Sequence, residues 1–297
     1  MQTASSMTLR QPDRALKPLA LTLDAVEQWA LAATAPLSAD RLRVVAFWYL
    51  DYVLQQVPEE RKTRYTMRLA QTECHGTAFG LKPALPDNDH ALVGQDAREL
   101  LIDRRFRDDI DRTALIDLLS GHVAEPAHDG VIVDQSSRDK YEFRARLFAD
   151  EAGAVLQRKG ASAIKGSRPN VLVIGATAGI IGALIDRGFD VAASDMSADV
   201  VGRSLGGVSV ESHTENDRLI EAADLAIITG MTLANQTLPV LAEAAKTHNT
   251  STMIWAITGK NLGRYYIEQG VDCVISDSSP FFLLSGPATL GVWRRQS

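Results

Sequence analysis

Cysteine is scarce in this chain: of 297 residues only Cys74 and Cys273 are cysteines, and they lie far apart with no metal-ligand spacing. Two distant cysteines cannot form a disulfide framework of the kind that stabilises small secreted proteins. This usage is typical of a reducing compartment. We therefore expect a cytoplasmic protein.

Positive charge and long apolar runs are also lacking. Lysine and arginine together number 31 against 37 acidic residues, which gives a formal net charge of -6. Because no strongly basic face is implied, a nucleic-acid partner is not expected. No uncharged apolar run reaches the roughly 20 residues that a bilayer-spanning helix needs. The N-terminus also lacks the apolar core of a signal peptide. We therefore expect no membrane partner. The partner that we expect is a small-molecule substrate.

The length exceeds that of a usual single domain and indicates two domains. Residues 1–20 are small and polar with two prolines, and we expect them to be disordered. Residues 21–160 are predicted to form an α+β domain. The stretch "ASAIKGSRPN", residues 161–170, is the best linker candidate, and residues 171–297 follow as a second domain.

Within the first domain, the segment "SADRLRVVAFWYLDYVLQQV", residues 38–57, has apolar side chains at three- and four-residue steps from Leu42 to Val53. This period predicts a buried helix. The segment "RYTMRLAQTECHGTAFGL", residues 64–81, alternates loosely and ends in glycines, which favours a strand and hairpin.

The second half shows short apolar runs separated mostly by helical segments. Alternating strands and helices predict a doubly wound, mostly parallel sheet, here a Rossmann-like domain preceded by the smaller α+β domain. The apolar runs lie at residues 171–174, 191–193, 208–210, 225–228, 252–257 and 273–275.

The stretch "VLVIGATAGIIGALIDRGFDVAASDMS" joins the first two of these runs. Its three glycines have GxxxGxxG spacing, which permits a tight turn, ligand approach and close helix packing. Asp195, 20 positions after Gly175, stands where an acid accepts hydrogen bonds from ribose hydroxyls and repels a 2′-phosphate. A plain strand–helix turn is the structural alternative. The residues expected to hold a nucleoside are Gly175, Ala176, Gly179, Asp195 and Ser197.

Three ligands compete for this stretch: NAD, a nucleoside such as S-adenosylmethionine, or something unrelated. It resembles the opening of short-chain dehydrogenases, but their Tyr-x-x-x-Lys pair is absent, because Tyr265 and Tyr266 are followed four positions later by Gln269 and Gly270. "GFDVAASDMS" is similar to the acidic second-strand loop of class I methyltransferases, in which the acid holds the adenosine ribose. The GxxxGxxG spacing lacks the middle glycine of the GxGxxG turn, which lets the backbone approach a pyrophosphate. S-adenosylmethionine has no pyrophosphate and does not need that glycine. We therefore favour S-adenosylmethionine over NAD.

A second loop lies in "ADLAIITGMTLANQTLPVLAEAAK", residues 223–246. A buried strand leads into it, so it is expected at the carboxyl edge of the sheet, where open α/β domains bind ligands. Its polar side chains can fix an anionic or polar group, or they can merely satisfy their own backbone. The candidate binding residues are Thr229, Gly230, Thr232, Asn235 and Thr237.

Together with "TMIWAITGKNLGRYYIEQGVDCVIS", this loop resembles the Rossmann-like domain of the family labelled "putative heavy-metal chelation", over roughly residues 170–280. Gly270, Val271 and Asp272 match its Gly-Val-Asp, whereas Lys260 stands where small residues are expected. The resemblance implies an N-terminal domain similar to the enolase N-terminal fold, to which "GQDARELL" contributes. The loop positions that match are Thr229, Gly230, Thr232, Asn235, Thr237 and Leu238.

Metal binding would require convergent ligands, and no two histidines form an i, i+4 pair. Soft thiol and imidazole ligands suit a transition metal. Cysteine and histidine residues that occur only as isolated pairs are usually surface or loop residues, so no defined metal site is predicted. The weak candidates are Cys74, His75, His122 and His128.

The leading hypothesis is an enzyme that uses S-adenosylmethionine as cosubstrate, a transferase or lyase acting on a small metabolite. No general base is identifiable, which permits aminocarboxypropyl transfer or cyclisation, because such steps depend on positioning and desolvation. Lys260 and Tyr265 follow the fifth strand and are the catalytic candidates. The alternative is a non-enzymatic binder of a metal or metal chelate, and a metal is not excluded. Cores of this kind often associate, which leaves a homodimer open.

Overall fold

The structure, a computed structural model, describes residues 20–54, 63–81, 91–134, 136–160, 168–277 and 287–296. The segment predicted to be disordered therefore lies outside the described residues except for Ala20. The predicted linker lies outside them except for its last three residues. Among the helices that are described, none combines the length and apolar character that crossing a bilayer requires.

The described elements run in the following order. The N-terminal part contains α1 (Leu23–Thr34), η1 (Ala39–Leu42), β1 (Ala46–Leu54), β2 (Thr63–Gln71), β3 (His75–Gly80), α2 (Ala97–Ile102) and α3 (Asp109–Val123). Next come β4 (Asp129–Val133), α4 (Ser137–Arg158), β5 (Asn170–Ile174), α5 (Ala178–Asp186), β6 (Asp190–Asp195), β7 (Ser204–Leu205), β8 (Val208–Ser212), η3 (His213–Glu215) and α6 (Asn216–Glu221). The last are β9 (Leu225–Thr229), α7 (Met231–Ala234), α8 (Leu238–Thr247), β10 (Ser251–Ala256), η4 (Lys260–Leu262), α9 (Gly263–Glu268), β11 (Cys273–Asp277) and β12 (Ala288–Arg294).

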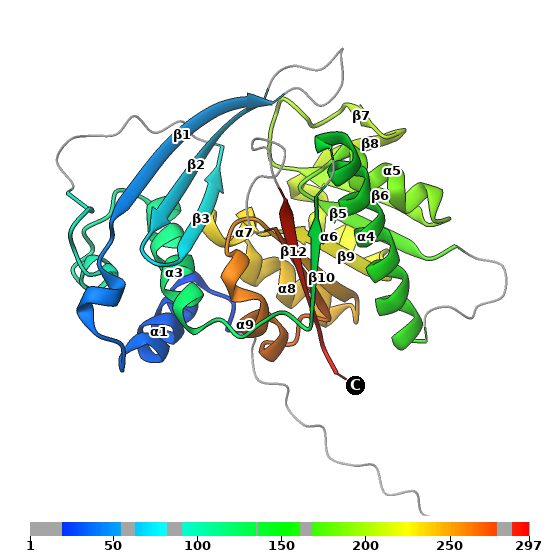
Figure 1. The fold of residues 1–297 in the computed structure, drawn as a ribbon. Helices are drawn as coiled ribbons and strands as arrows, with labels where there is room; N and C mark the ends of the chain where they lie inside the picture. The colour runs from blue at the N-terminus through cyan, green and yellow to red at the C-terminus, as the bar shows by residue number, and fades with distance from the viewer. Residues whose placement is uncertain are drawn as a thin grey trace, which may run out of the picture.

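The smaller sheet is antiparallel, with order β1-β2-β3, and α3 packs against it (Figure 1). The hairpin predicted at residues 64–81 is confirmed by the pairing of β2 with β3. The helix predicted at residues 38–57 is wrong, because β1 pairs with β2 from Ala46↔Gln71 to Leu54↔Thr63. Aromatic side chains there favour a pleated, half-buried surface, and cross-strand pairing outweighs the three- and four-residue period.

The larger sheet has nine described strands in the order β4-β12-β11-β10-β9-β5-β6-β8-β7. Its six central strands, from β11 to β8, are parallel, and β12, β4 and β7 pair antiparallel. All six apolar runs read from the sequence become these parallel strands, so the large, mostly parallel sheet is confirmed. The chain continues from β5 to β6 on one side, whereas β9 lies on the other side of β5.

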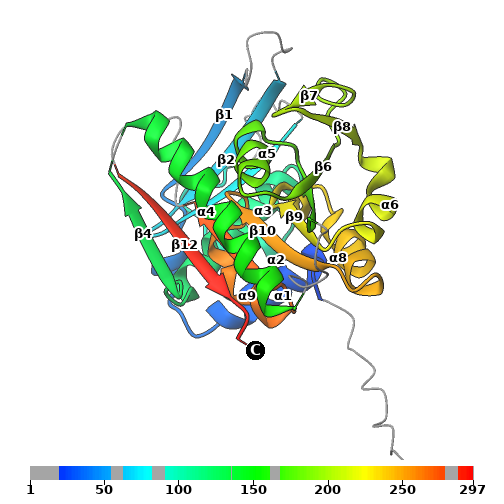
Figure 2. The same ribbon diagram turned by 90° about the vertical axis from the view of Figure 1, so that its right-hand side faces the viewer.

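Helices cover both faces of the larger sheet. Along β5, Val171 and Val173 pack with apolar side chains of α4 and α5, such as Phe148. Leu172 and Ile174 belong to the core on the opposite face, which includes α6, α8 and α9. Figure 2 shows α4 lying across the sheet beside β12 and β4. Because these strands are buried on both faces of the sheet, successive side chains are apolar, and each strand is a short, nearly continuous apolar run in the sequence.

The division between the two sheets does not fall at the predicted linker. β4 and α4 precede residues 161–170 in the chain, yet β4 pairs with β12 from Ala288↔Val133 to Val292↔Asp129. Along the chain, the elements of the smaller sheet therefore end with α3, and those of the larger sheet begin with β4. A strand that pairs with one near the far end of the chain leaves no local signal of that partnership in its own sequence.

Hydrogen bonds join the smaller sheet to the loop after β10. The Thr77 hydroxyl donates to the Ile257 carbonyl oxygen at 2.6 Å, and the Phe79 amide donates to the Thr258 hydroxyl at 2.9 Å. Both Thr77 and Thr258 are buried. The smaller sheet is thus fixed against the carboxyl edge of the larger one.

Candidate functional site

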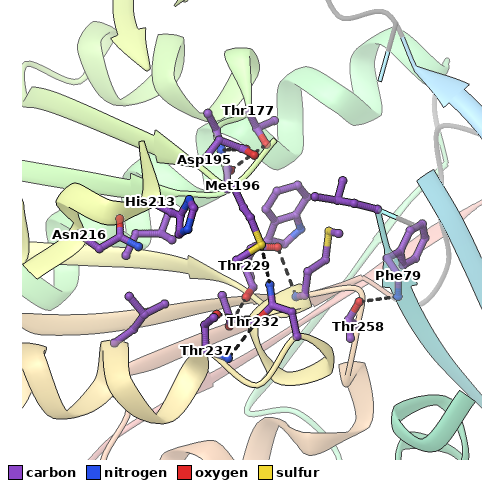
Figure 3. A pocket seen from close by; sticks show the side chains of 18 of the residues that line it. Phe79, Thr177, Asp195, Met196, His213, Asn216, Thr229, Thr232, Thr237 and Thr258 are labelled. Carbon is purple, nitrogen blue, oxygen red and sulfur yellow. Dashed lines mark hydrogen bonds between the residues drawn. The ribbon is translucent and has the colours of Figure 1, made fainter. Parts of the chain in front are cut away.

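A cavity of about 720 Å³ lies at the carboxyl ends of β5, β6, β9 and β10 (Figure 3). Its wall includes Gly175, Asp195, Thr229 and Trp255 from these strand ends, and Phe79 from the smaller sheet. Side chains of α4 and α8 line it as well. The two sheets and the long helix α4 therefore enclose one site, which most of the candidate binding residues share.

Asp195 ends β6 and is held in a fixed position at the cavity wall. Its Oδ2 accepts the Ala176 amide at 2.9 Å, and its Oδ1 accepts the Ser197 amide at 2.8 Å. Burial raises the pKa of Asp195, while these amide hydrogen bonds and the nearby His213 oppose the increase. The backbone amide of Met196 also stabilises the carboxylate. A carboxylate can accept about four hydrogen bonds, so Asp195 keeps capacity for a donor from a ligand.

Gly175 forms the turn after β5 with a φ of +89°, a left-handed conformation that favours glycine. A Cβ at this position would lie 2.6 Å from Cγ2 of Thr229 at the end of β9. The two neighbouring strand ends therefore approach each other closely. The sequence prediction of a glycine required for a tight turn is confirmed here.

Gly179 has a different role from the one expected. A Cβ at this position would lie 2.3 Å from the Tyr141 hydroxyl oxygen, and the Gly179 amide donates to that oxygen at 2.9 Å. Gly179 is not among the described residues that line the cavity. Its small size accommodates Tyr141 of α4 instead of a ligand.

The loop after β9 contains the short helix α7, where an irregular loop was expected. The Thr232 hydroxyl donates to the Thr229 carbonyl oxygen at 2.6 Å, and the Asn235 side-chain oxygen accepts the Thr237 hydroxyl at 2.6 Å. These polar groups thus satisfy one another locally. The amide nitrogen of Asn235 faces the Met196 sulfur at 3.9 Å, and all five residues line the cavity.

Two further candidate binding residues, Gly230 and Ser197, contribute to the local backbone structure. The Gly230 amide donates to the Trp255 carbonyl oxygen at 2.7 Å, and a Cβ there would lie 2.3 Å from the Thr258 carbonyl oxygen. The Ser197 hydroxyl accepts the amide of Asp199 at 3.3 Å. Gly230 therefore permits close approach of the loops after β9 and β10, and Ser197 stabilises the turn after Asp195.

Lys260 and Tyr265 lie away from this cavity, contrary to the expectation that they enter the cleft. Lys260 is buried near Asp117 and Cys74, burial lowers its pKa, and it lines a separate cavity of about 350 Å³. The Tyr265 ring packs on Trp29 with centroids 5.0 Å apart, and burial raises the pKa of Tyr265 to about 12. The sequence placed both correctly after β10 but could not tell which side of the loop they face.

The metal-ligand candidates do not converge. His122 Nε2 lies 2.7 Å from the Thr72 hydroxyl, and His128 Nδ1 accepts the Arg294 amide at 2.9 Å. Within the described ranges, no group of three or more His, Cys, Asp and Glu side chains could hold a metal ion.

Several cavity residues escaped the sequence reasoning. His213 and Asn216 follow β8, the third parallel strand, and the rule that ligands bind at strand ends would have pointed to them. Met196 directly follows Asp195. Tyr141 and Trp255 come from α4 and the end of β10. No local pattern indicates that Tyr141 reaches the site, because only packing of α4 on the sheet brings it there.

Comparison with known proteins identifies a related family. Residues 165–256 match the model of the family DUF364, described as "Putative heavy-metal chelation". No curated protein gives a significant match. The resemblance to this family seen in the sequence is confirmed over the matched residues.

Two solved structures of proteins of unknown function from that family share the fold. The protein from Pyrococcus horikoshii has a TM-score of 0.57 at 13% identity, with 93% of this chain and 99% of that chain covered. The protein from Desulfitobacterium hafniense has a TM-score of 0.51 at 11% identity, with 90% and 98% covered. The family match thus covers residues 165–256, and the fold of two family members extends over nearly the whole chain.

Proposed function

We propose that the protein is an enzyme that binds S-adenosylmethionine or a related nucleoside in the cavity at the strand ends and acts on a small metabolite. The observation that carries the proposal is the position of Asp195. Its carboxylate is fixed by two backbone amides at the cavity wall, at the end of the strand next to β5. An acid in this place accepts hydrogen bonds from the two hydroxyls of a ribose.

The order of the parallel strands supports this proposal. Counted along the chain from β5, the order β8-β6-β5-β9-β10-β11 reads 3-2-1-4-5-6. In doubly wound sheets with this strand order, ligands bind where the order reverses, here between β5 and β9. The cavity lies at that point.

The size and lining of the cavity suit a nucleoside. A volume of about 720 Å³ falls within the range of small-molecule sites. The exposed Met196 side chain provides apolar surface for a base on the Asp195 side, and His213 and Asn216 provide polar atoms for its edge. This half of the cavity therefore offers both stacking and hydrogen bonding.

The other half of the cavity leaves space for a second substrate or for the amino-acid part of S-adenosylmethionine. There the Arg144 guanidinium lies 4.9 Å from the Trp255 ring centroid and 3.2 Å from Asp277. In aminocarboxypropyl transfer, the electron pair of a nucleophile forms a bond to the γ-carbon. The carbon–sulfur bond breaks with its electrons passing to sulfur, which releases methylthioadenosine. Positioning and desolvation can accelerate this step without a protein base.

The test compares nucleoside binding by the wild type and by Asp195→Asn. Titration calorimetry with S-adenosylmethionine and methylthioadenosine should show binding to the wild type. Loss of the charged acceptor should weaken it about 10- to 100-fold, as expected for hydrogen bonds to a charged group. Asp217→Asn is the matched control, since Asp217 also lines the cavity but its side chain is 84% exposed.

Two outcomes would contradict the proposal. One is an Asp195→Asn variant that binds nucleosides as tightly as the wild type. The other is a wild-type protein that only divalent metal ions stabilise in thermal-shift assays, because a ligand that binds the folded state raises its stability by mass action.

A further inference from the structure

The start of α5 is the point at which a nucleotide phosphate would be expected. In sheets with this strand order, a phosphate meets the first amides of the helix that follows the first strand, helped by the helix dipole. Here Asp195 accepts the amide of Ala176, two residues before α5 begins at Ala178. A ribose held by Asp195 therefore has the start of α5 beside it.

Tyr141 occupies this place. Its hydroxyl oxygen accepts the Gly179 amide at 2.9 Å, and the preceding residue, Ala178, has an interaction partner as well. A single carbon added to Gly179 would lie 2.3 Å from the hydroxyl oxygen and 2.5 Å from Cζ of the ring. A phosphate group is larger than that carbon. The ring thus takes both the donor and the volume that a phosphate requires.

Tyr141 is also held firmly in position. It belongs to α4, a helix of 22 residues whose apolar side chains pack on the larger sheet. The Arg144 guanidinium lies 5.6 Å from the Tyr141 ring centroid and bonds to Asp277 of β11. Displacing the ring would disturb this buried contact, so a phosphate could not push it aside freely.

We infer that the cavity selects nucleosides without a 5′-phosphate, such as adenosine, methylthioadenosine or S-adenosylmethionine, and that Tyr141 excludes ADP, ATP and NAD. This inference rests on the proposed function and narrows its ligand class. Tyr141 acts as a specificity residue, because it places a hydroxyl group and a ring at the start of α5, where nucleotide-binding sheets of this strand order present free amides to a phosphate.

Calorimetric titration of the full-length wild type and of Tyr141→Ala, Tyr141→Leu and Tyr141→Phe with adenosine and ADP tests the inference. The wild type should bind adenosine at least tenfold more tightly than ADP. Tyr141→Ala and Tyr141→Leu open the space beside Gly179 and should reduce this preference at least threefold. Tyr141→Phe keeps the ring and should keep the preference. The melting temperature of each variant shows whether it is folded, and Tyr141→Leu retains apolar packing if the alanine variant is unstable.

Tyr65→Ala is the matched control, because it removes a tyrosine from the same cavity but from the smaller sheet. It should leave the ratio of adenosine to ADP affinity unchanged. A wild type that binds ADP as tightly as adenosine overturns the inference, and so does a ratio that neither Tyr141→Ala nor Tyr141→Leu changes. Absence of binding by any nucleoside instead overturns the proposed function itself.

Discussion

Gly175 shows how one residue sets the shape of the cavity wall. Its backbone is left-handed, and the space that a side chain would need is filled by Thr229. Gly182, seven positions later in α5, is helical and has no atom within 4 Å of a Cβ. Both glycines belong to the GxxxGxxG pattern of the sequence, but only Gly175 occupies a position at which the structure requires a glycine.

We expect Gly175→Ala to lower the free energy of unfolding by about 2–4 kcal/mol, since it adds left-handed strain to a clash with Thr229. Gly182→Ala should be neutral or stabilising by about 0.5–1 kcal/mol, because alanine is a better helix former than glycine. Urea unfolding of both variants measures the difference. Equal destabilisation by the two substitutions would show that the turn after β5 does not need glycine.

At the scale of elements, Arg294 of β12 pairs with acidic side chains of both α4 and β4. Its guanidinium donates to both oxygens of Glu151 in α4, at 2.7 and 2.5 Å, and also pairs with Asp129 of β4. Glu151 is buried. One arginine therefore ties a helix and an edge strand to β12, and α4 carries the Tyr141 that shapes the cavity.

Arg294→Ala should reduce the free energy of unfolding by about 1–3 kcal/mol, because it leaves the Glu151 carboxylate buried without its cation. The control is Arg138→Ala on the same helix, whose pair with Glu142 is exposed, with Arg138 at 86%. Loss of such an exposed pair should have a much smaller effect, because solvent screens it. Chemical denaturation curves that coincide for the two variants would argue against the role assigned to Arg294.

At the scale of the whole molecule, Asp117 of α3 joins the two sheets. Its carboxylate accepts the amides of Thr77 in β3 and of Asn261 in η4, both at 2.8 Å. The side-chain amide of Asn261 donates to the carbonyl oxygens of His75 and Asp117. These bonds hold the smaller sheet, which contributes Tyr65 and Phe79 to the cavity wall, against the carboxyl edge of the larger one.

Burial raises the pKa of Asp117 to about 6, against the attraction of Lys260 and the amide hydrogen bonds. The folded state thus keeps this proton to a higher pH than the unfolded state does, so the contribution of Asp117 to stability falls as pH rises from about 4 to about 6. Asp117→Asn cannot titrate. The unfolding free energy of this variant, measured relative to the wild type, should therefore improve as pH rises over that window. A pH-independent difference would contradict the raised pKa.

Local patterns were sufficient for much of the larger sheet and for part of the site. The six parallel strands are buried on both faces and therefore appear as apolar runs, and Gly175 and Asp195 stand at fixed distances from the strand ends. The segment at residues 46–54 was misread as a helix because its apolar spacing fits both periods. Its pairing with β2, the next strand along the chain, decides between them, and the apolar spacing of the segment does not show that pairing.

The sequence alone thus determined the parallel sheet, its glycine turn and the acid after β6, because each depends on neighbours a few residues away. Only the tertiary structure decided that β4 and α4 join this sheet, that Lys260 and Tyr265 face away from the cavity, and that Tyr141 covers the start of α5. Those features depend on contacts between residues far apart in the chain. Such contacts are selected by packing and hydrogen bonding of the whole fold rather than by any local pattern.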